Sequence, residues 1–174
     1  MARKKDYKQL NTSPLDTGIR NFTATFKYFT YYAPNIDSCQ TSGKIEGERA
    51  DEVLRDMLVS ANIRNKSRFL KSIKRQSWAK SDFDTDIIDF EDSRMLCDVY
   101  GNETELTALL RHIRNAFAHG YIYIWKKRSG NFVFFVDYKK ENNRPPRISA
   151  KILISMSILE RWKAILENEI ATGE

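Results

Sequence analysis

Hydrophobic side chains recur at intervals of three and four residues in four segments of the chain, which predicts amphipathic helices. The four segments are residues 14–33, residues 48–63, residues 103–119 and the stretch that opens at Ser157. Ser157 and Glu160 match a capping box, which indicates a helix start. The third segment has the clearest bounds, because Asn102 can cap its start and Gly120 supplies the residue type that often ends a helix.

After Gly120 the hydrophobic period changes to two, which is typical of strands. Residues 121–125 and 132–138 are aromatic and β-branched runs on either side of a polar turn, so they predict a hairpin. Residues 148–154 alternate as a third strand. The chain has only 7 Gly and 4 Pro, which favours long helices over an all-β sandwich. The predicted fold class is therefore mainly α, a helical bundle with a small antiparallel β-meander inserted before the C-terminal helix.

The length of 174 residues suits one domain, and we expect a flexible basic arm over residues 1–11 followed by a single domain over residues 12–174. No signal peptide and no apolar run of membrane-spanning length is evident, so we expect a cytoplasmic protein that does not enter a membrane. Cys39 and Cys97 lie far apart without a Cys/His cluster, which is typical of reduced core thiols. We therefore expect neither a metal nor a cofactor.

The formal net charge of +6 suits a polyanionic partner such as RNA. Residues 64–80 contain seven basic residues and no acidic one. If a helix continues through this segment, its basic residues align on one side at spacings of four, three and four: Arg64, Arg68, Lys71 and Arg75. This basic stripe could follow an RNA backbone, or it could simply be a solvated face; the sequence leaves both interpretations open.

On the helix over residues 103–119, Asn115 and His119 fall on the side opposite the core stripe, with Arg114 at its shoulder. The small residues Ala116 and Ala118 accompany them, so we expect this side to stay outside the chain's own core and to suit a groove or a symmetric interface. The alternative is that a histidine at a helix C-terminus only complements the helix dipole.

The string from Leu110 to Gly120, LRHIRNAFAHG, resembles the Arg-(polar)-x-x-x-His signature of the HEPN superfamily. This resemblance implies a HEPN-like bundle whose late helix carries the motif, and a metal-independent RNA endonuclease with Arg114, Asn115 and His119 as catalytic residues. It also implies a homodimer, because two such motifs face each other across one shared cleft in that superfamily. A defence or toxin-like role follows from the resemblance alone. The alternative is a non-catalytic HEPN-like dimer that binds nucleotides or RNA or serves as an adaptor.

The implied roles agree with the chemistry of RNA cleavage, which needs a base, a cation and an acid. His119 can exchange a proton near neutral pH, and Arg114 can bind a phosphate through two N–H groups. Asn115 would orient a neighbour. Tyr121 extends the resemblance to the Arg-x4-His-x-Tyr form of HEPN toxins, which implies adenylylation of this tyrosine by a nucleotidyltransferase antitoxin. Tyr121 also fits the start of the predicted strand, which is the alternative.

Overall fold

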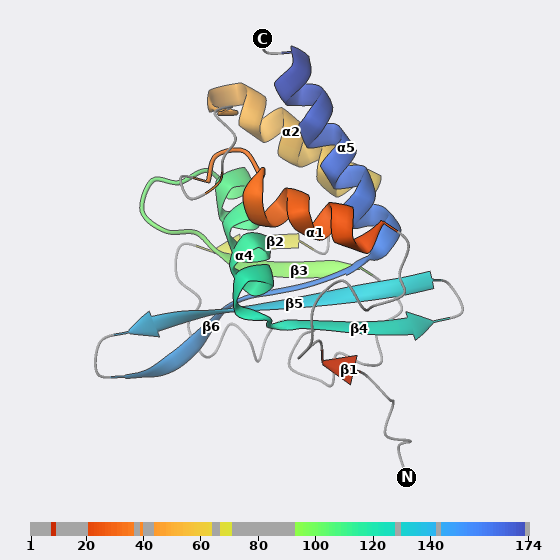
Figure 1. Ribbon diagram of the computed structural model, residues 1–174. Coiled ribbons are helices and arrows are strands. Elements are labelled where there is room, and N and C mark those ends of the chain that lie inside the picture. The colour runs from red at the N-terminus through yellow and green to blue at the C-terminus, as the bar shows by residue number, and fades with distance from the viewer. Residues whose placement is uncertain are drawn as a thin grey trace.

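The computed structural model describes residues 8–9, 21–36, 39, 44–63, 67–70, 93–127, 130–141 and 144–172. In these residues, helices cover one face of a six-stranded sheet (Figure 1). The helices are α1 (Phe22–Tyr31), α2 (Gly47–Ser60), α4 (Glu105–His119) and α5 (Met156–Thr172). The strands are β1 (Lys8–Gln9), β2 (Ser67–Leu70), β3 (Arg94–Asp98), β4 (Ile122–Lys127), β5 (Gly130–Glu141) and β6 (Arg144–Ser155).

The strand order across the sheet is β1-β4-β5-β6-β3-β2. The expected hairpin and third strand are present as β4, β5 and β6, with Ile122 opposite Phe135 and Phe135 opposite Ile152. These pairs are antiparallel, whereas β2 and β3 are parallel, so the sheet is mixed.

The prediction of a mainly α bundle with a small meander was wrong. The meander of β4, β5 and β6 is the centre of a larger sheet, which β1 extends on one side and β3 and β2 extend on the other. Pairing between distant segments builds these additions: Lys8 pairs with Ile124, and Met95 pairs with Ile152. Two residues of the segment assigned to a basic arm, Lys8 and Gln9, thus form a strand.

The condition under which the basic stripe would align, a helix through this segment, is not met over residues 67–70, because Ser67–Leu70 is a strand. Phe69 lies opposite Cys97, and this strand runs parallel to β3. Strand geometry points successive side chains to opposite faces, so the helical spacing that would align the basic stripe does not hold there.

Side-chain hydroxyls cap the starts of α4 and α5, although not at the residues predicted. Thr104, not Asn102, caps α4: its hydroxyl accepts a hydrogen bond from the amide of Thr107 at 3.1 Å. At the start of α5, the hydroxyl of Ser155, not Ser157, accepts from the amide of Ile158 at 3.3 Å. Gly120 ends α4 as expected, with φ of 71°, in the left-handed region that glycine adopts without strain.

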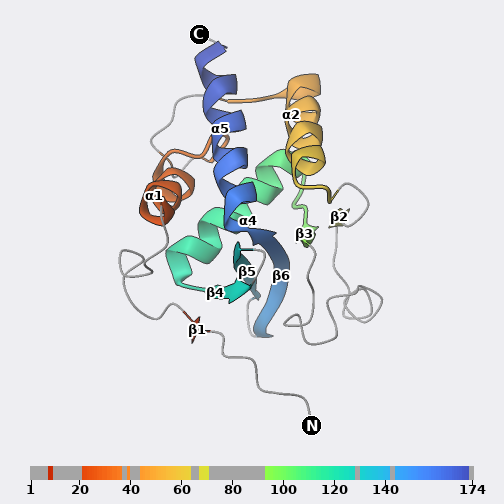
Figure 2. The same cartoon turned by 90° about the vertical axis from the view of Figure 1, so that its right-hand side faces the viewer.

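Helix α4 lies between the other helices and the sheet (Figure 2). Phe117 shows this position: its ring packs edge-on against Phe26 of α1 at 5.0 Å and against Phe135 of β5 at 5.1 Å. Trp162 of α5 is fully buried and donates its indole N–H to the carbonyl of Met57 at 2.7 Å, which joins α5 to α2. Because α4 is central, both its apolar and its polar residues have buried surroundings.

Candidate functional site

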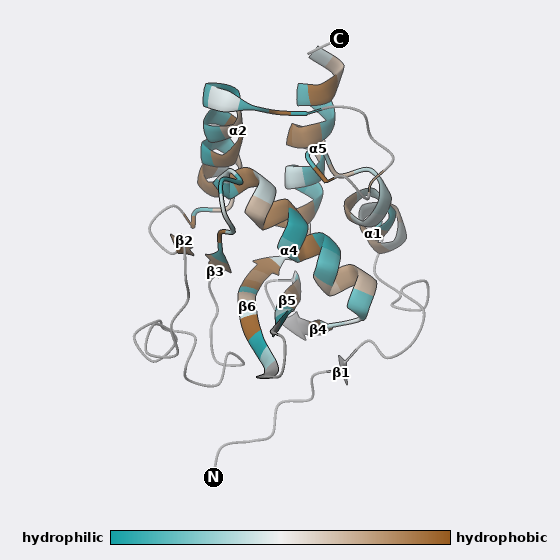
Figure 3. Cartoon of the chain, turned by 90° about the vertical axis from the view of Figure 1, so that its left-hand side faces the viewer, coloured by the Kyte–Doolittle hydropathy of each residue, from teal (hydrophilic) through white to brown (hydrophobic). Residues whose placement is uncertain are grey.

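Two sides of α4 are buried, which corrects the expectation that the side carrying the polar motif stays outside the core. His112 and Ala116 are both fully buried. Polar and apolar residues alternate along the helix (Figure 3). Arg114 and Asn115 are half-buried, while Ala118 and His119 are exposed. The last turn of α4 therefore exposes Ala118 and His119 for contacts outside the chain, and Arg114 and Asn115 are partly accessible beside it.

His112 lies in a buried hydrogen-bond network between α4 and the sheet. Its Nδ1 is 2.7 Å from Oδ2 of Asp137 on β5, and its Nε2 is 2.7 Å from the carbonyl oxygen of Asp98 on β3. A carbonyl oxygen only accepts, so Nε2–H donates to Asp98, and Nδ1 forms the hydrogen bond with the carboxylate of Asp137. This histidine therefore fixes α4 to two strands and has no access to a substrate.

Asp137 connects this buried network to the predicted motif. Its Oδ2 also accepts a hydrogen bond from Asn115 Nδ2 at 3.3 Å, and its Oδ1 accepts from the amide of Tyr138 at 2.9 Å. The register of β5 and β6 shifts between Asp137 and Tyr138. Such an irregularity changes where a strand directs its side chains. The side-chain amide of Asn115 is thus held by the sheet, while its orienting role stays a prediction.

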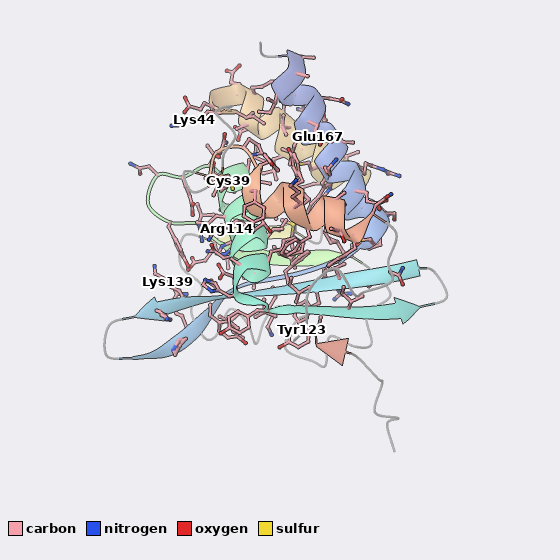
Figure 4. All side chains as sticks on the ribbon, in the orientation of Figure 1. Cys39, Lys44, Arg114, Tyr123, Lys139 and Glu167 are labelled. Atoms are coloured by element: carbon pink, nitrogen blue, oxygen red, sulfur yellow. The ribbon has the colours of Figure 1, made fainter. Side chains whose placement is uncertain are left out.

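Arg114 is the neighbour that Asn115 contacts, since Nη1 of Arg114 donates to Oδ1 of Asn115 at 3.3 Å. The Nε–H of Arg114 is buried and has no hydrogen-bond partner in the described part of the chain. Figure 4 shows Arg114 on α4 between Cys39 and Lys139. The charge of Arg114 acts on Cys39, whose pKa is nevertheless raised, chiefly by burial. Among the described residues, the guanidinium of Arg114 thus makes one hydrogen bond, to Asn115.

Arg111 precedes His112 and is fully engaged. Its Nε and Nη2 donate to the two carboxylate oxygens of Glu103, at 2.9 and 2.6 Å. Its guanidinium lies 4.0 Å from the ring centroid of Tyr100, over which the ammonium of Lys139 also lies at 3.9 Å. Burial lowers the pKa of Arg111, but the hydrogen bonds and charge of Glu103 outweigh that and raise it overall. Arg111 is thus held by Glu103 and Tyr100, whereas the guanidinium of Arg114 makes a single hydrogen bond among the described residues.

His119 lies at the exposed end of α4, beside Tyr121. The ring centroids of His119 and Tyr121 are 6.2 Å apart, and Tyr121 in turn contacts Tyr138 at 4.8 Å. The structure thus brings Arg114 and Asn115 into contact and places His119 on the next turn of the same helix. Among the described residues, no hydrogen bond joins His119 to either of them.

The four residues of the predicted RNA-binding stripe fall largely outside the described residues. Arg68 is in β2, while Arg64, Lys71 and Arg75 lie outside the described ranges. A role in RNA binding stays a prediction for all four.

Sequence reasoning missed the network residues His112, Asp137 and Glu103. For His112 a signal existed, because it lies one position from Ile113 of the core stripe, as buried histidines often do. Asp137 had a weaker one: it is the acidic residue inside an otherwise aromatic and β-branched strand. Sequence reasoning placed Glu103 at the helix start. Its hydrogen bonds with Arg111, eight residues later, could not be predicted from that position.

The described residues contain no group of three histidine, cysteine or acidic side chains that could hold a metal ion. Within the same ranges, no helix is both long and apolar enough to cross a bilayer. Both cysteines are free thiols.

A protein-family profile described as HEPN pEK499 p136 matches residues 47–170, which is more than half of the chain. The match runs from α2 to α5 and contains α4 with all three predicted catalytic residues. No curated protein and no solved structure matches the chain.

Proposed function

The chain belongs to the HEPN pEK499 p136 family, and from this membership and the geometry of α4 we propose that it is a metal-independent RNA endonuclease. The observation that carries the proposal is that the C-terminal end of α4 presents an arginine and an exposed histidine close together. Arg114 is half-buried with only one guanidinium hydrogen bond among the described residues, to Asn115, and His119 is exposed on the next turn. A cation beside an exposed imidazole is what phosphodiester cleavage requires.

The proposed reaction is attack of the RNA 2′-oxygen on the adjacent phosphorus, with departure of the 5′-oxygen. A base takes the 2′-hydroxyl proton, and an acid gives a proton to the leaving oxygen, so a cyclic phosphate and a 5′-hydroxyl result. Arg114 binds the phosphate oxygens as negative charge develops on them. Asn115 holds Arg114, and Asp137 holds Asn115.

One chain supplies a single exposed histidine, since the other of its two histidines, His112, is buried in the network. Base and acid together need two groups, which supports a composite site in a homodimer, with His119 and the partner subunit's His119 in one cleft. The exposed Ala118 beside His119 leaves room for a second helix to approach. This dimer is the proposed arrangement of the active site.

The test is incubation of the purified protein with total RNA in the presence of EDTA, beside a His119→Ala variant. We expect fragments that end in a cyclic phosphate, and a rate on the order of a hundredfold lower for the variant. Loss of cleavage in EDTA, equal cleavage of 2′-deoxy substrates, or full activity of folded His119→Ala would refute the mechanism. RNA binding without cleavage would instead support a non-catalytic binding dimer.

The proposed biological role is that of a defence or toxin-like effector in the cytoplasm. Its proposed partner is a nucleotidyltransferase antitoxin that adenylylates Tyr121. The side chain of Tyr121 is 37% exposed and adjoins His119, so a modification there would obstruct the site. Co-expression with such an enzyme, followed by mass spectrometry, tests this: the added mass should disappear in Tyr121→Phe.

A further inference from the structure

Two tyrosines continue the row of rings that begins at His119. The ring centroids are 6.2 Å apart for His119 and Tyr121 and 4.8 Å apart for Tyr121 and Tyr138. Each tyrosine keeps 37% of its surface exposed. Large apolar side chains are exposed at only a few other places in the described residues, and these two contact each other beside the candidate site. Clustered exposed aromatic surface commonly marks a binding site.

The backbone that presents these rings is held firmly. The amide of Tyr121 donates to the carbonyl of Ala116 in α4, and its own carbonyl accepts from the amide of Val136 in β5, both at 3.0 Å. The amide of Tyr138 donates to the carboxylate of Asp137 at 2.9 Å. Rings on a fixed backbone lose little conformational entropy when a ligand stacks on them.

The charges around the two tyrosines suit a phosphate-bearing ligand. Burial raises the pKa of the Tyr138 hydroxyl, with further contributions from Tyr123 and Tyr121, so this phenol carries no charge at neutral pH. Lys140 is exposed two residues after Tyr138, whereas the ammonium of Lys139 lies over the ring of Tyr100. An aromatic surface flanked by cations is typical of sites for single-stranded nucleic acid, where bases stack and the backbone meets positive charge. It is less typical of an apolar protein contact.

We propose that Tyr121 and Tyr138 form a stacking site for one unpaired nucleobase of a single-stranded nucleic acid. A nucleotide whose base lies on these rings keeps its phosphate near His119. The inference rests on the proposed function only in naming RNA as the natural ligand and in assigning His119 to the phosphate. Base stacking itself needs neither a 2′-hydroxyl nor cleavage.

The test therefore measures binding alone. Fluorescence anisotropy compares a labelled single-stranded oligodeoxyadenylate with an abasic oligonucleotide of the same length and charge. Neither has a 2′-hydroxyl, so neither is a substrate of the proposed reaction, and failure of cleavage leaves this experiment unaffected. We expect the wild-type protein to bind the base-bearing probe more tightly than the abasic one.

Tyr121→Ala and Tyr138→Ala should each weaken binding of the base-bearing probe about tenfold, the usual cost of losing one stacked base. Binding of the abasic probe should not change, and the salt dependence should keep its slope because no phosphate contact is lost. Tyr138→Phe keeps the ring and should bind as the wild type does. Tyr31→Ala removes an exposed tyrosine of α1 and is the matched control.

Equal binding of the two probes by the wild-type protein would overturn the proposal without any variant. It would also be overturned if the alanine variants bind the base-bearing probe normally, or lose both probes equally. If they change only the oligomeric mass in sedimentation, the tyrosines are a contact between copies of the chain and the proposal is wrong.

Discussion

The carboxylate of Asp137 lies 2.7 Å from Nδ1 of His112, and both residues are almost completely buried. The same oxygen accepts from Asn115 at 3.3 Å, so one strand residue holds two residues of α4. A buried carboxylate that loses a hydrogen-bond partner costs more than that bond contributes, and here Arg111, 4.0 Å away, is the cation that remains near Asp137. The chain has two histidines, the buried His112 and the exposed His119. Substituting each in turn compares a structural imidazole with an exposed one.

We expect His112→Ala to lower the free energy of unfolding by about 3–5 kcal/mol, as removal of one partner from a buried pair does. His119→Ala should change it by less than about 0.5 kcal/mol, because exposed substitutions rarely do more. Urea unfolding followed by tryptophan fluorescence measures both, since Trp162 is buried in the native state. Similar effects of the two substitutions would contradict the assignment of His112 to the core.

A second prediction separates positioning from direct contact with the substrate. Arg114→Ala should reduce single-turnover cleavage on the order of a hundredfold, because it removes the phosphate ligand. Asn115→Ala should cost less, about tenfold, because it only frees Arg114 to move. Asp137→Asn should act on cleavage through Asn115, so the Asp137→Asn, Asn115→Ala double variant should lose little more than Asn115→Ala. Additive losses would show that Asp137 acts by another route.

The dimer prediction can be checked at the exposed end of α4. Ala118→Arg places a large charged side chain beside His119, where a second copy should approach, and should yield monomers without unfolding the chain. Val59→Arg, on an exposed position of α2, is the matched control and should stay dimeric. Sedimentation velocity at micromolar concentration distinguishes them. A wild-type protein that sediments as a monomer would refute the shared cleft.

The basic stripe can be tested even though three of its residues lie outside the described ranges. Reversing Arg68 and Lys71 to Glu should weaken RNA binding and flatten its dependence on salt, because fewer counterions are released. Lys44→Glu reverses an exposed charge in the α1–α2 connection and serves as the control. Unchanged affinity at every salt concentration would leave the stripe as a solvated surface.

Both thiols should react slowly with iodoacetamide in the native protein. Burial is the largest influence on Cys39 and on Cys97, and it raises both pKa values. A raised thiol pKa leaves less thiolate at neutral pH, and the thiolate is the reacting form. Alkylation followed by mass spectrometry should show faster modification of both in urea than in buffer. Rapid native alkylation of Cys97 would contradict its burial.

The sequence predicted the elements whose signals are local. Helix α4 and its end at Gly120 follow from hydrophobic spacing and one glycine, and the β4–β5 hairpin follows from alternation on both sides of a polar turn. The fold class failed because it depends on pairing between distant segments. Strand β3 is short, and the charged residues Arg94 and Asp98 at its ends leave only three apolar residues between them. Three residues are too few to show the alternation of a strand.

The site was predictable only in part for the same reason. Arg114, Asn115 and His119 lie on one helix, so their spacing can be predicted from the local sequence. Arg114 and Asn115 are neighbours in the chain and do form a hydrogen bond. The hydrogen bond from Asn115 to Asp137 depends on where β5 crosses α4. A helical wheel describes one helix and cannot predict this crossing. The wheel also placed His112 beside Asn115 and His119, away from the core, and this was wrong because α4 packs against helices and the sheet and buries His112 completely.

The pairing of β1 with β4 has a consequence for synthesis of the chain on the ribosome. Lys8 is made before α1, but its partner Ile124 emerges only after α1, α2 and α4. Until then β1 has no strand to join, and β4 then emerges with an edge that β1 must cover. An unpaired edge of aromatic and β-branched residues invites pairing with other chains. Slower translation after residue 127 would give the N-terminal strand time to reach this edge before a neighbouring nascent chain does.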